Sequence, residues 1–268
     1  MARLLYITRL LSMFAVPIAA LSLFTPAMGQ SALQPELAAV QYNPPNRGAP
    51  SETRNALSRA GLCGNLTAIQ PSQTNWGETI RERPTFAIYV DESAKNLTFE
   101  LEDKMTGETL HNVIFDQVTG PGISLYTLPD TAPALEIDHQ YRWQVSLECE
   151  QFSTPQTPQR GTKASDGTIV RRTLSNELQT ALATTADNEK PALLAANGLW
   201  YDTVQTLLAW QLTYPDTETW VEQWQGLLKH PMVQLHDLLE SAPVDCCLAA
   251  NCPTASADMP DTERLVAH

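Results

Sequence analysis

The chain is poor in positive charge and, after residue 29, in long apolar runs. Of its 268 residues, 17 are Lys or Arg and 30 are Asp or Glu, which gives a formal net charge of −13. Nucleic acid and anionic lipid headgroups are bound by clusters of Lys and Arg. A membrane-spanning helix needs an apolar stretch of about 20 residues. We therefore expect no nucleic-acid partner and no stable membrane span in the mature chain.

Motifs that carry catalysis or hold cofactors are also missing. The sequence contains no Gly-x-Ser-x-Gly motif, no cysteine-protease signature, no phosphate loop, no dinucleotide fingerprint and no Ca²⁺-binding loop. His230, His236, Cys246, Cys247 and Cys252 lie within a short stretch, but their spacing does not match known zinc sites. We therefore expect no metal and no cofactor, and we expect that the protein is not an enzyme.

The N-terminus has the pattern of a signal peptide. Arg3 and Arg9 precede an apolar run over residues 10–24, and small residues at Ala27 and Gly29 predict cleavage before residue 30. An uncleaved N-terminal anchor is the alternative interpretation. Either way, the pattern predicts export and a periplasmic or extracellular location.

Alternating polarity dominates the middle of the chain. In the segment 141–150, YRWQVSLECE, every second residue from Tyr141 is apolar or cysteine, and the residues between them are polar. This pattern is typical of an antiparallel strand with one buried face. Seven such candidate strands lie at 66–70, 84–90, 96–103, 109–116, 122–129, 141–150 and 167–174.

These strands predict the architecture. Seven short strands separated by turn residues favour two packed antiparallel sheets, a β-sandwich that is immunoglobulin-like in general architecture. After residue 174 the apolar period becomes helical, which predicts a C-terminal helical hairpin region and an α+β chain. The expected divisions are a signal peptide (1–29), a flexible linker (30–62), a β-sandwich domain (63–173), a helical region (174–240) and a flexible tail (241–268).

The five cysteines form two groups in the sequence. Cys63 precedes the first candidate strand and Cys149 ends the sixth, and in an exported chain we expect them to form a disulfide. Two free buried cysteines are the alternative. The pairing of Cys246, Cys247 and Cys252 stays open, because their odd number leaves one thiol unpaired or bonded to another molecule.

Aromatic residues are concentrated in the predicted helices. They favour either a core between helices and sheets or, if exposed, a binding patch, because aromatic side chains anchor protein interfaces. The possible interface residues are Trp200, Tyr201, Trp210, Trp220 and Trp224.

Several separated motifs resemble the cyanobacterial exported proteins of domain-of-unknown-function family 928. They are Arg47-Gly48-Ala49-Pro50, Cys63 with Leu66-Thr67-Ala68, Pro84-Thr85-Phe86, Tyr141-Arg142-Trp143 with Cys149, and Gly198-Leu199-Trp200-Tyr201-Asp202. The strand at 87–91 departs from the family pattern at both ends. The resemblance implies a cyanobacterial exported protein and supplies no catalytic residues.

These observations favour an exported, non-catalytic binding or assembly module of the cell envelope, with another envelope protein as its partner. One alternative is an envelope glycan or peptide hydrolase. It would use carboxylates such as Glu100 with Glu102 or Glu148 with Glu150, but period two places each pair on a solvated sheet face. The other alternative is a carbohydrate-binding module that uses aromatic residues on a strand face.

We predict that the mature protein contains a Cys63–Cys149 disulfide. Peptide mass mapping without reduction is expected to find the two cysteine-containing peptides linked, because exported chains pair their thiols. Alkylation of both cysteines in the unreduced protein would contradict the prediction.

Overall fold

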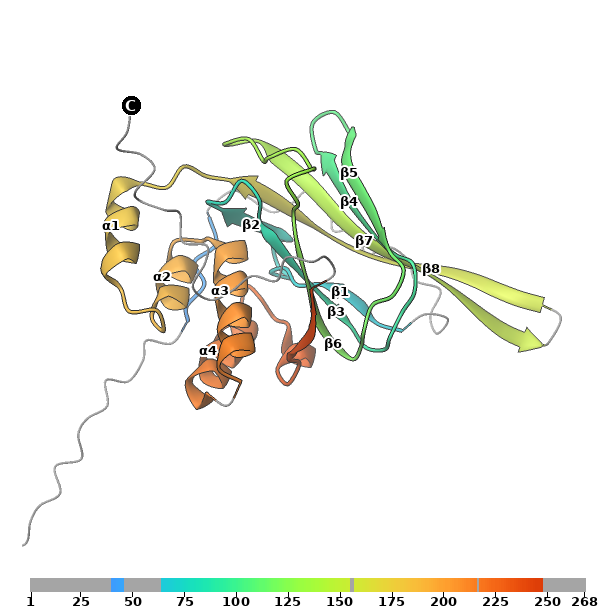
Figure 1. Cartoon of the computed structure of the whole chain (residues 1–268). Helices are drawn as coiled ribbons and strands as arrows, with labels where there is room; N and C mark the ends of the chain where they lie inside the picture. The colour runs from blue at the N-terminus through green and yellow to red at the C-terminus, as the bar shows by residue number, and fades with distance from the viewer. Residues whose placement is uncertain (1–39, 46–63, 155–156, 216, 248–268) are drawn as a thin grey trace, which may run out of the picture. The chain divides into compact units, whose positions relative to one another are not determined.

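The computed structural model describes residues 40–45, 64–154, 157–215 and 217–247, and it gives only the backbone for residues 149–160 and 245–247. All of these residues belong to one compact unit, Leu37–His268. Within the described ranges the chain is a mixed α+β protein with a four-stranded sheet, a five-stranded sheet and four α-helices (Figure 1).

The four-stranded sheet has the order β1-β3-β6-β9. Its strands are β1 (Leu66–Ala68), β3 (Thr85–Val90), β6 (Gly122–Thr127) and β9 (Pro243–Cys247). β3 pairs antiparallel with β1 and β6, whereas β9 runs parallel to β6. The sheet therefore combines early strands with a strand from the end of the described chain.

The five-stranded sheet has the order β2-β8-β7-β4-β5. Its strands are β2 (Trp76–Thr79), β8 (Thr157–Arg171), β7 (Gln140–Thr154), β4 (Leu97–Asp103) and β5 (Thr109–Phe115). Along β7, Tyr141, Trp143, Val145 and Leu147 are buried and the residues between them are less buried, as their alternation predicts.

The helices follow the last long strand. They are α1 (Asn176–Thr184), α2 (Lys190–Ala196), α3 (Trp200–Thr213) and α4 (Glu218–Lys229), with a 3₁₀ turn at His236–Leu238. The Ser175 side chain accepts a hydrogen bond from the Leu178 N–H and so caps α1. Gly198, with φ +76°, adopts the left-handed conformation that ends α2.

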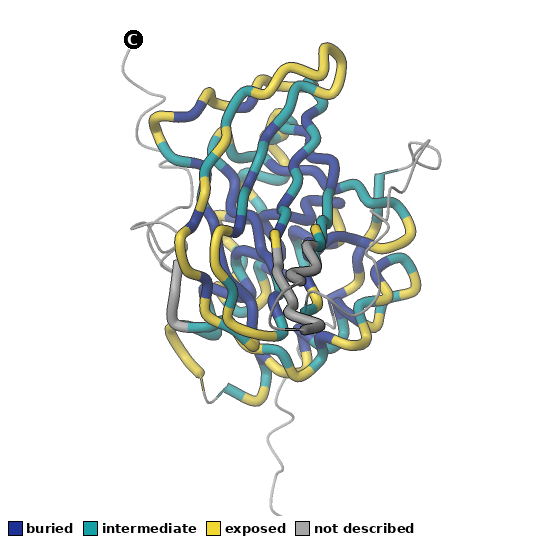
Figure 2. The backbone as a smooth tube through the Cα atoms, turned by 90° about the vertical axis from the view of Figure 1, so that its right-hand side faces the viewer, coloured by how far each residue is buried: buried dark blue, intermediate teal, exposed yellow. Residues whose placement is uncertain are grey.

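The two sheets contact each other through aromatic side chains. Phe86 of β3 lies 4.9 Å, between ring centroids, from both Phe99 of β4 and Trp143 of β7. Tyr126 of β6 lies 4.7 Å from Phe99. In Figure 2 the buried positions gather in the interior and the exposed ones lie mainly in connecting segments. The main core therefore lies between the sheets.

Strand β2 lies outside the seven candidate strands, and β8 begins ten residues before the candidate strand at 167–174. Both β2 and β9 are short strands in parallel pairs. β2 is held in its sheet by β8 and β9 by β6, both far away in the sequence. Such strands need no clear alternating pattern of their own.

Parts of the expected linker and tail belong to the folded core. Val40 and Tyr42 are 0% and 2% exposed, and the Asn43 N–H donates to the Ala195 carbonyl at 3.0 Å. The Tyr42 ring lies 5.1 Å from the Trp200 ring in an edge-on arrangement. β9 lies within the expected tail. These segments are ordered because they bury apolar surface or complete a sheet edge.

We predict that Tyr42→Ala lowers the free energy of unfolding by about 3 kcal/mol, because it leaves a cavity against Trp200. Gln41→Ala is the control, since Gln41 is exposed on the same segment. Urea unfolding of both variants measures the difference. Equal stability of the two variants would show that residues 40–45 do not contribute to the core.

Candidate binding surface

The outer face of the five-stranded sheet, opposite the aromatic core, carries polar side chains in cross-strand rows. The strand register sets one row as Asn112, Glu100, Gln144 and Asp166, and the next as Glu102, Arg142, Thr168 and Trp76. Neighbours in a row lie about 5 Å apart. These residues share one face because their odd-numbered neighbours on β4 and β7, such as Phe99 and Trp143, face the core.

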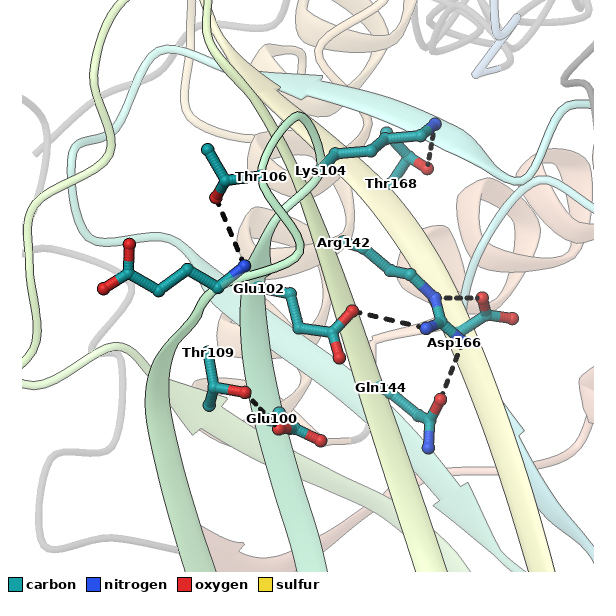
Figure 3. A network of polar contacts seen from close by, with 10 residues as sticks. Glu100, Glu102, Lys104, Thr106, Thr109, Arg142, Gln144, Asp166 and Thr168 are labelled. Carbon is teal, nitrogen blue, oxygen red and sulfur yellow. Dashed lines mark hydrogen bonds and ion pairs between the residues drawn. The ribbon is translucent and has the colours of Figure 1, made fainter.

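Arg142 is the centre of this face (Figure 3). Its Nε donates to Asp166 Oδ2 at 2.9 Å and its Nη1 to Glu102 Oε2 at 3.3 Å. Its Nη2 donates to Gln144 Oε1 at 2.7 Å. One guanidinium therefore joins three strands, β4, β7 and β8.

The electrostatics of this network favour the ion pairs. Burial alone lowers the pKa of Arg142, but its hydrogen bond to Asp166 and the charges of Asp166 and Glu102 outweigh burial and raise that pKa. The three side chains are between 15% and 29% exposed, so solvent screens part of the attraction. The network holds the three side chains in one arrangement, in which one guanidinium lies between two carboxyl groups.

Further polar contacts surround Arg142. Lys104 Nζ donates to Thr168 Oγ1 at 3.2 Å and lies 5.5 Å from the Trp76 ring centroid, a cation–π contact. Thr109 Oγ1 donates to Glu100 Oε1 at 2.7 Å. The face is thus a bonded polar surface on which Lys104 lies over Trp76.

A buried carboxyl lies in the core, on helix α3. Asp202 on α3 is 2% exposed and accepts a hydrogen bond from the Ile80 N–H at 3.1 Å. Its Oδ1 lies 3.3 Å from Arg81 Nε. Burial raises the pKa of Asp202, and the nearby charge of Arg81 opposes that rise. These contacts anchor α3 to the segment after β2.

The tryptophan-rich helices contribute mostly to the core, which is one of the two interpretations that the sequence leaves open. Trp200, Tyr201, Trp220 and Trp224 are at most 5% exposed, and Trp210 is half-buried. The indole N–H of Trp200 donates to the Ile69 carbonyl, and that of Trp220 to the Leu207 carbonyl. Burial is favourable because these polar atoms find partners inside the protein.

A second feature is the distal part of β7 and β8, which we call the ribbon (Glu148–Thr154 with Thr157–Thr162). β4 pairs with β7 only from Tyr141 to Leu147, and β2 pairs with β8 only near its end. Beyond Leu147 the described strands β7 and β8 pair only with each other. Figure 1 shows the two strands extending past the rest of the sheet.

The cysteine predictions fall outside the described side chains. Cys63, Cys149, Cys246, Cys247 and Cys252 have no described side-chain position. The disulfide stays a prediction. One side-chain contact lies near both positions in the sequence. Lys163 Nζ donates to Asn65 Oδ1 at 3.3 Å, and Lys163 pairs with Leu147, two residues before Cys149.

Neither a metal-ligand cluster nor a membrane-length helix occurs in the described ranges. No three His, Cys, Asp or Glu residues there come together as a metal site would require. None of the helices in those ranges has the length and hydropathy needed to cross a bilayer.

Sequence reasoning missed the residues of the outer face. Arg142 and Gln144 were recognisable as the polar side of a strand, and Glu100 and Glu102 as a solvated pair. Asp166 had no signal, because only the register of β7 with β8 brings it beside Arg142.

We predict that Arg142→Met lowers the free energy of unfolding by about 1–2 kcal/mol, because Glu102 and Asp166 are left without their partner. Lys163→Met removes one positive charge from the same sheet and is expected to change stability by less than about 0.5 kcal/mol. Chemical denaturation compares the two. Equal losses would show that Arg142 acts only through net charge.

Comparison with known proteins gives a family and little more. The immunoglobulin-like domain from the M. primoryensis ice-binding adhesin is 14% identical, covering 42% of this chain and all of that one, with a TM-score of 0.19, too low to support an argument. No curated protein matches. The family described as Domain of Unknown Function (DUF928) matches residues 49–243. That match covers most of the chain, which therefore belongs to the DUF928 family.

Proposed function

We propose that this protein is an exported, non-catalytic assembly module of the cell envelope that contacts another envelope protein through its ribbon. The main support for this proposal is that β7 and β8 continue beyond β4 and β2, the strands that flank them nearer the core. Export is supported by the signal-peptide pattern at residues 1–29.

The ribbon suits a contact role for a physical reason. A two-stranded antiparallel ribbon is only marginally stable in water. Its outer edges present backbone N–H and C=O groups that another strand can pair with. Strand addition to such an edge is a common mode of protein recognition. A partner that adds a strand would stabilise the ribbon and be bound by it.

The carboxyl groups support a non-catalytic role. A glycoside hydrolase needs one carboxyl that carries a proton near neutral pH beside a second, charged one. Glu102 and Asp166 are both bonded to the guanidinium of Arg142, which lies between them. Asp202 has a raised pKa but lies in the core. Neither arrangement offers an accessible acid.

The carbohydrate-binding alternative would use Trp76 on the outer face. Trp76 is half-buried, and Lys104 lies over its ring at 5.5 Å. A sugar ring could stack on Trp76 only by displacing Lys104 from this contact and from Thr168. This cost makes the ribbon the better-supported contact element.

We infer that the two sheets form an immunoglobulin-like β-sandwich, supported by the aromatic contacts of Phe86 with Phe99 and Trp143. We also infer that α3 and α4 form a helical hairpin, supported by the hydrogen bond from Trp220 Nε1 to the Leu207 carbonyl at 2.6 Å. In this arrangement the ribbon would project from a rigid base.

We predict that a photo-crosslinking residue at Glu148 forms an adduct with an envelope protein in intact cells. Glu148 is exposed and lies where the ribbon begins. The control position is Met105, which is 77% exposed in the turn between β4 and β5. Mass spectrometry identifies the adducts.

The adducts formed at residues 148 and 105 are then compared. An adduct from residue 148 that is missing from residue 105 supports a contact through the ribbon. No adduct from residue 148, or the same adducts from both positions, would contradict the proposed function.

A further inference from the structure

We propose that the partner of the ribbon is a second copy of this chain, paired antiparallel along the β7 ribbon edge, Glu148–Thr154. This inference rests on the proposed contact role of the ribbon. The edge starts just beyond Leu147, which pairs with Leu97, the first residue of β4, and it stops before the connection to β8. Pairing two such edges would join the two ribbons into one four-stranded sheet.

The direction of the β7 backbone groups follows from described hydrogen bonds. The Gln140 carbonyl accepts from the Lys104 N–H at 3.1 Å, so Gln140 directs its backbone groups to the β4 side. Thr168, which pairs with Arg142, donates its N–H away from β7, to the Asn75 carbonyl at 3.0 Å. Since backbone groups alternate along an antiparallel strand, even-numbered residues of β7 face the β4 side.

The same alternation continues along the ribbon. The register of β7 with β8 is regular from Gln140 to Phe152. Glu148, Glu150 and Phe152 therefore direct their backbone N–H and C=O groups toward the β7 ribbon edge. The intervening residues bond to β8. Each of the three edge-facing residues has a backbone N–H, so the edge offers three donors and three acceptors.

The opposite edge of the ribbon is blocked. Pro158 lies an even number of residues from Thr168, so its nitrogen faces the outer edge of β8. Proline has no N–H, and prolines in sheets commonly occupy such edge positions and prevent strand addition. The β7 edge contains no proline between Glu148 and Thr154. A partner strand is therefore expected on the β7 side.

The residue order of the edge favours self-pairing in one register. A two-fold axis at Gln151 places Glu150 opposite Phe152 of the second copy, and Glu148 opposite Thr154. Glu150 and Phe152 both face the edge, so each such pair can exchange two backbone hydrogen bonds. An axis at Glu150 would place Glu150 opposite itself. An axis at Cys149 would place Glu148 opposite Glu150, and facing like charges are unfavourable.

The charge of the chain makes this pairing dependent on salt. The formal net charge of −13 makes two copies repel each other. Salt screens that repulsion, because the Debye length falls from about 30 Å at 0.01 M to about 8 Å at 0.15 M ionic strength. The edge-to-edge contact is small, so we expect a weak dimer whose population rises with ionic strength.

Sedimentation velocity of the purified mature protein, over a concentration series up to about 100 µM, tests the inference. Glu150→Pro removes an edge-facing N–H without removing a bond to β8, and it is expected to weaken dimerisation at least about tenfold. Arg160→Pro is the matched control, because Arg160 pairs with Glu150 and faces the already blocked β8 edge. Glu150→Gln controls for charge. Both controls are expected to dimerise as well as the wild type.

A wild-type protein that stays monomeric, or a Glu150→Pro variant that dimerises like the wild type, would overturn the inference. Equal weakening by Arg160→Pro would also overturn it, because the β7 edge would not be special. The proposed function fails separately, when residue 148 gives no position-specific adduct in cells. A monomeric protein whose residue 148 crosslinks to a different envelope protein would retain the function and reject self-pairing.

Discussion

The packing of Trp143 against Tyr201 is the contact on which the rest of the structure depends. The indole N–H of Trp143 donates to the Tyr201 hydroxyl at 2.6 Å, and that hydroxyl donates to the Thr168 carbonyl at 3.1 Å. Helix α3 is thereby joined to β7 and β8. Such close approach requires glycine nearby, because a Cβ on Gly167 would lie 2.8 Å from the Trp143 indole nitrogen.

Trp143 lies on the inner face of the five-stranded sheet, and the two faces of that sheet differ. The inner face holds large aromatic and aliphatic side chains, whose burial stabilises the fold. The outer face is held by Arg142 and its carboxylate partners. Arg142 directly precedes Trp143 on β7, so the two side chains point to opposite faces of the sheet. Because the inner face is packed and the outer face is a bonded polar surface, the ends of the strands are the places where a partner could add without rearranging the core.

The ribbon is such a strand end. It is continuous with β7, which Trp143 anchors in the core, so a contact on the ribbon would be transmitted to a fixed base and not to a loose loop. Membership of the DUF928 family provides no activity to compare, and the contact role of the ribbon therefore stands on the strand geometry of this chain alone.

The sequence by itself determined the strands with clear alternation, the inward position of Trp143, the helical character of the region after residue 174 and the family. Local periodicity is sufficient for these, because each residue's face is set by its own neighbours along the strand or helix. Only the tertiary structure decided that Tyr42 belongs to the core, that β2 and β9 complete the sheets, that the tryptophans of α3 and α4 are buried, and that Asp166 lies beside Arg142. These features depend on partners far away in the chain, and no local pattern records which distant segment will supply the contact.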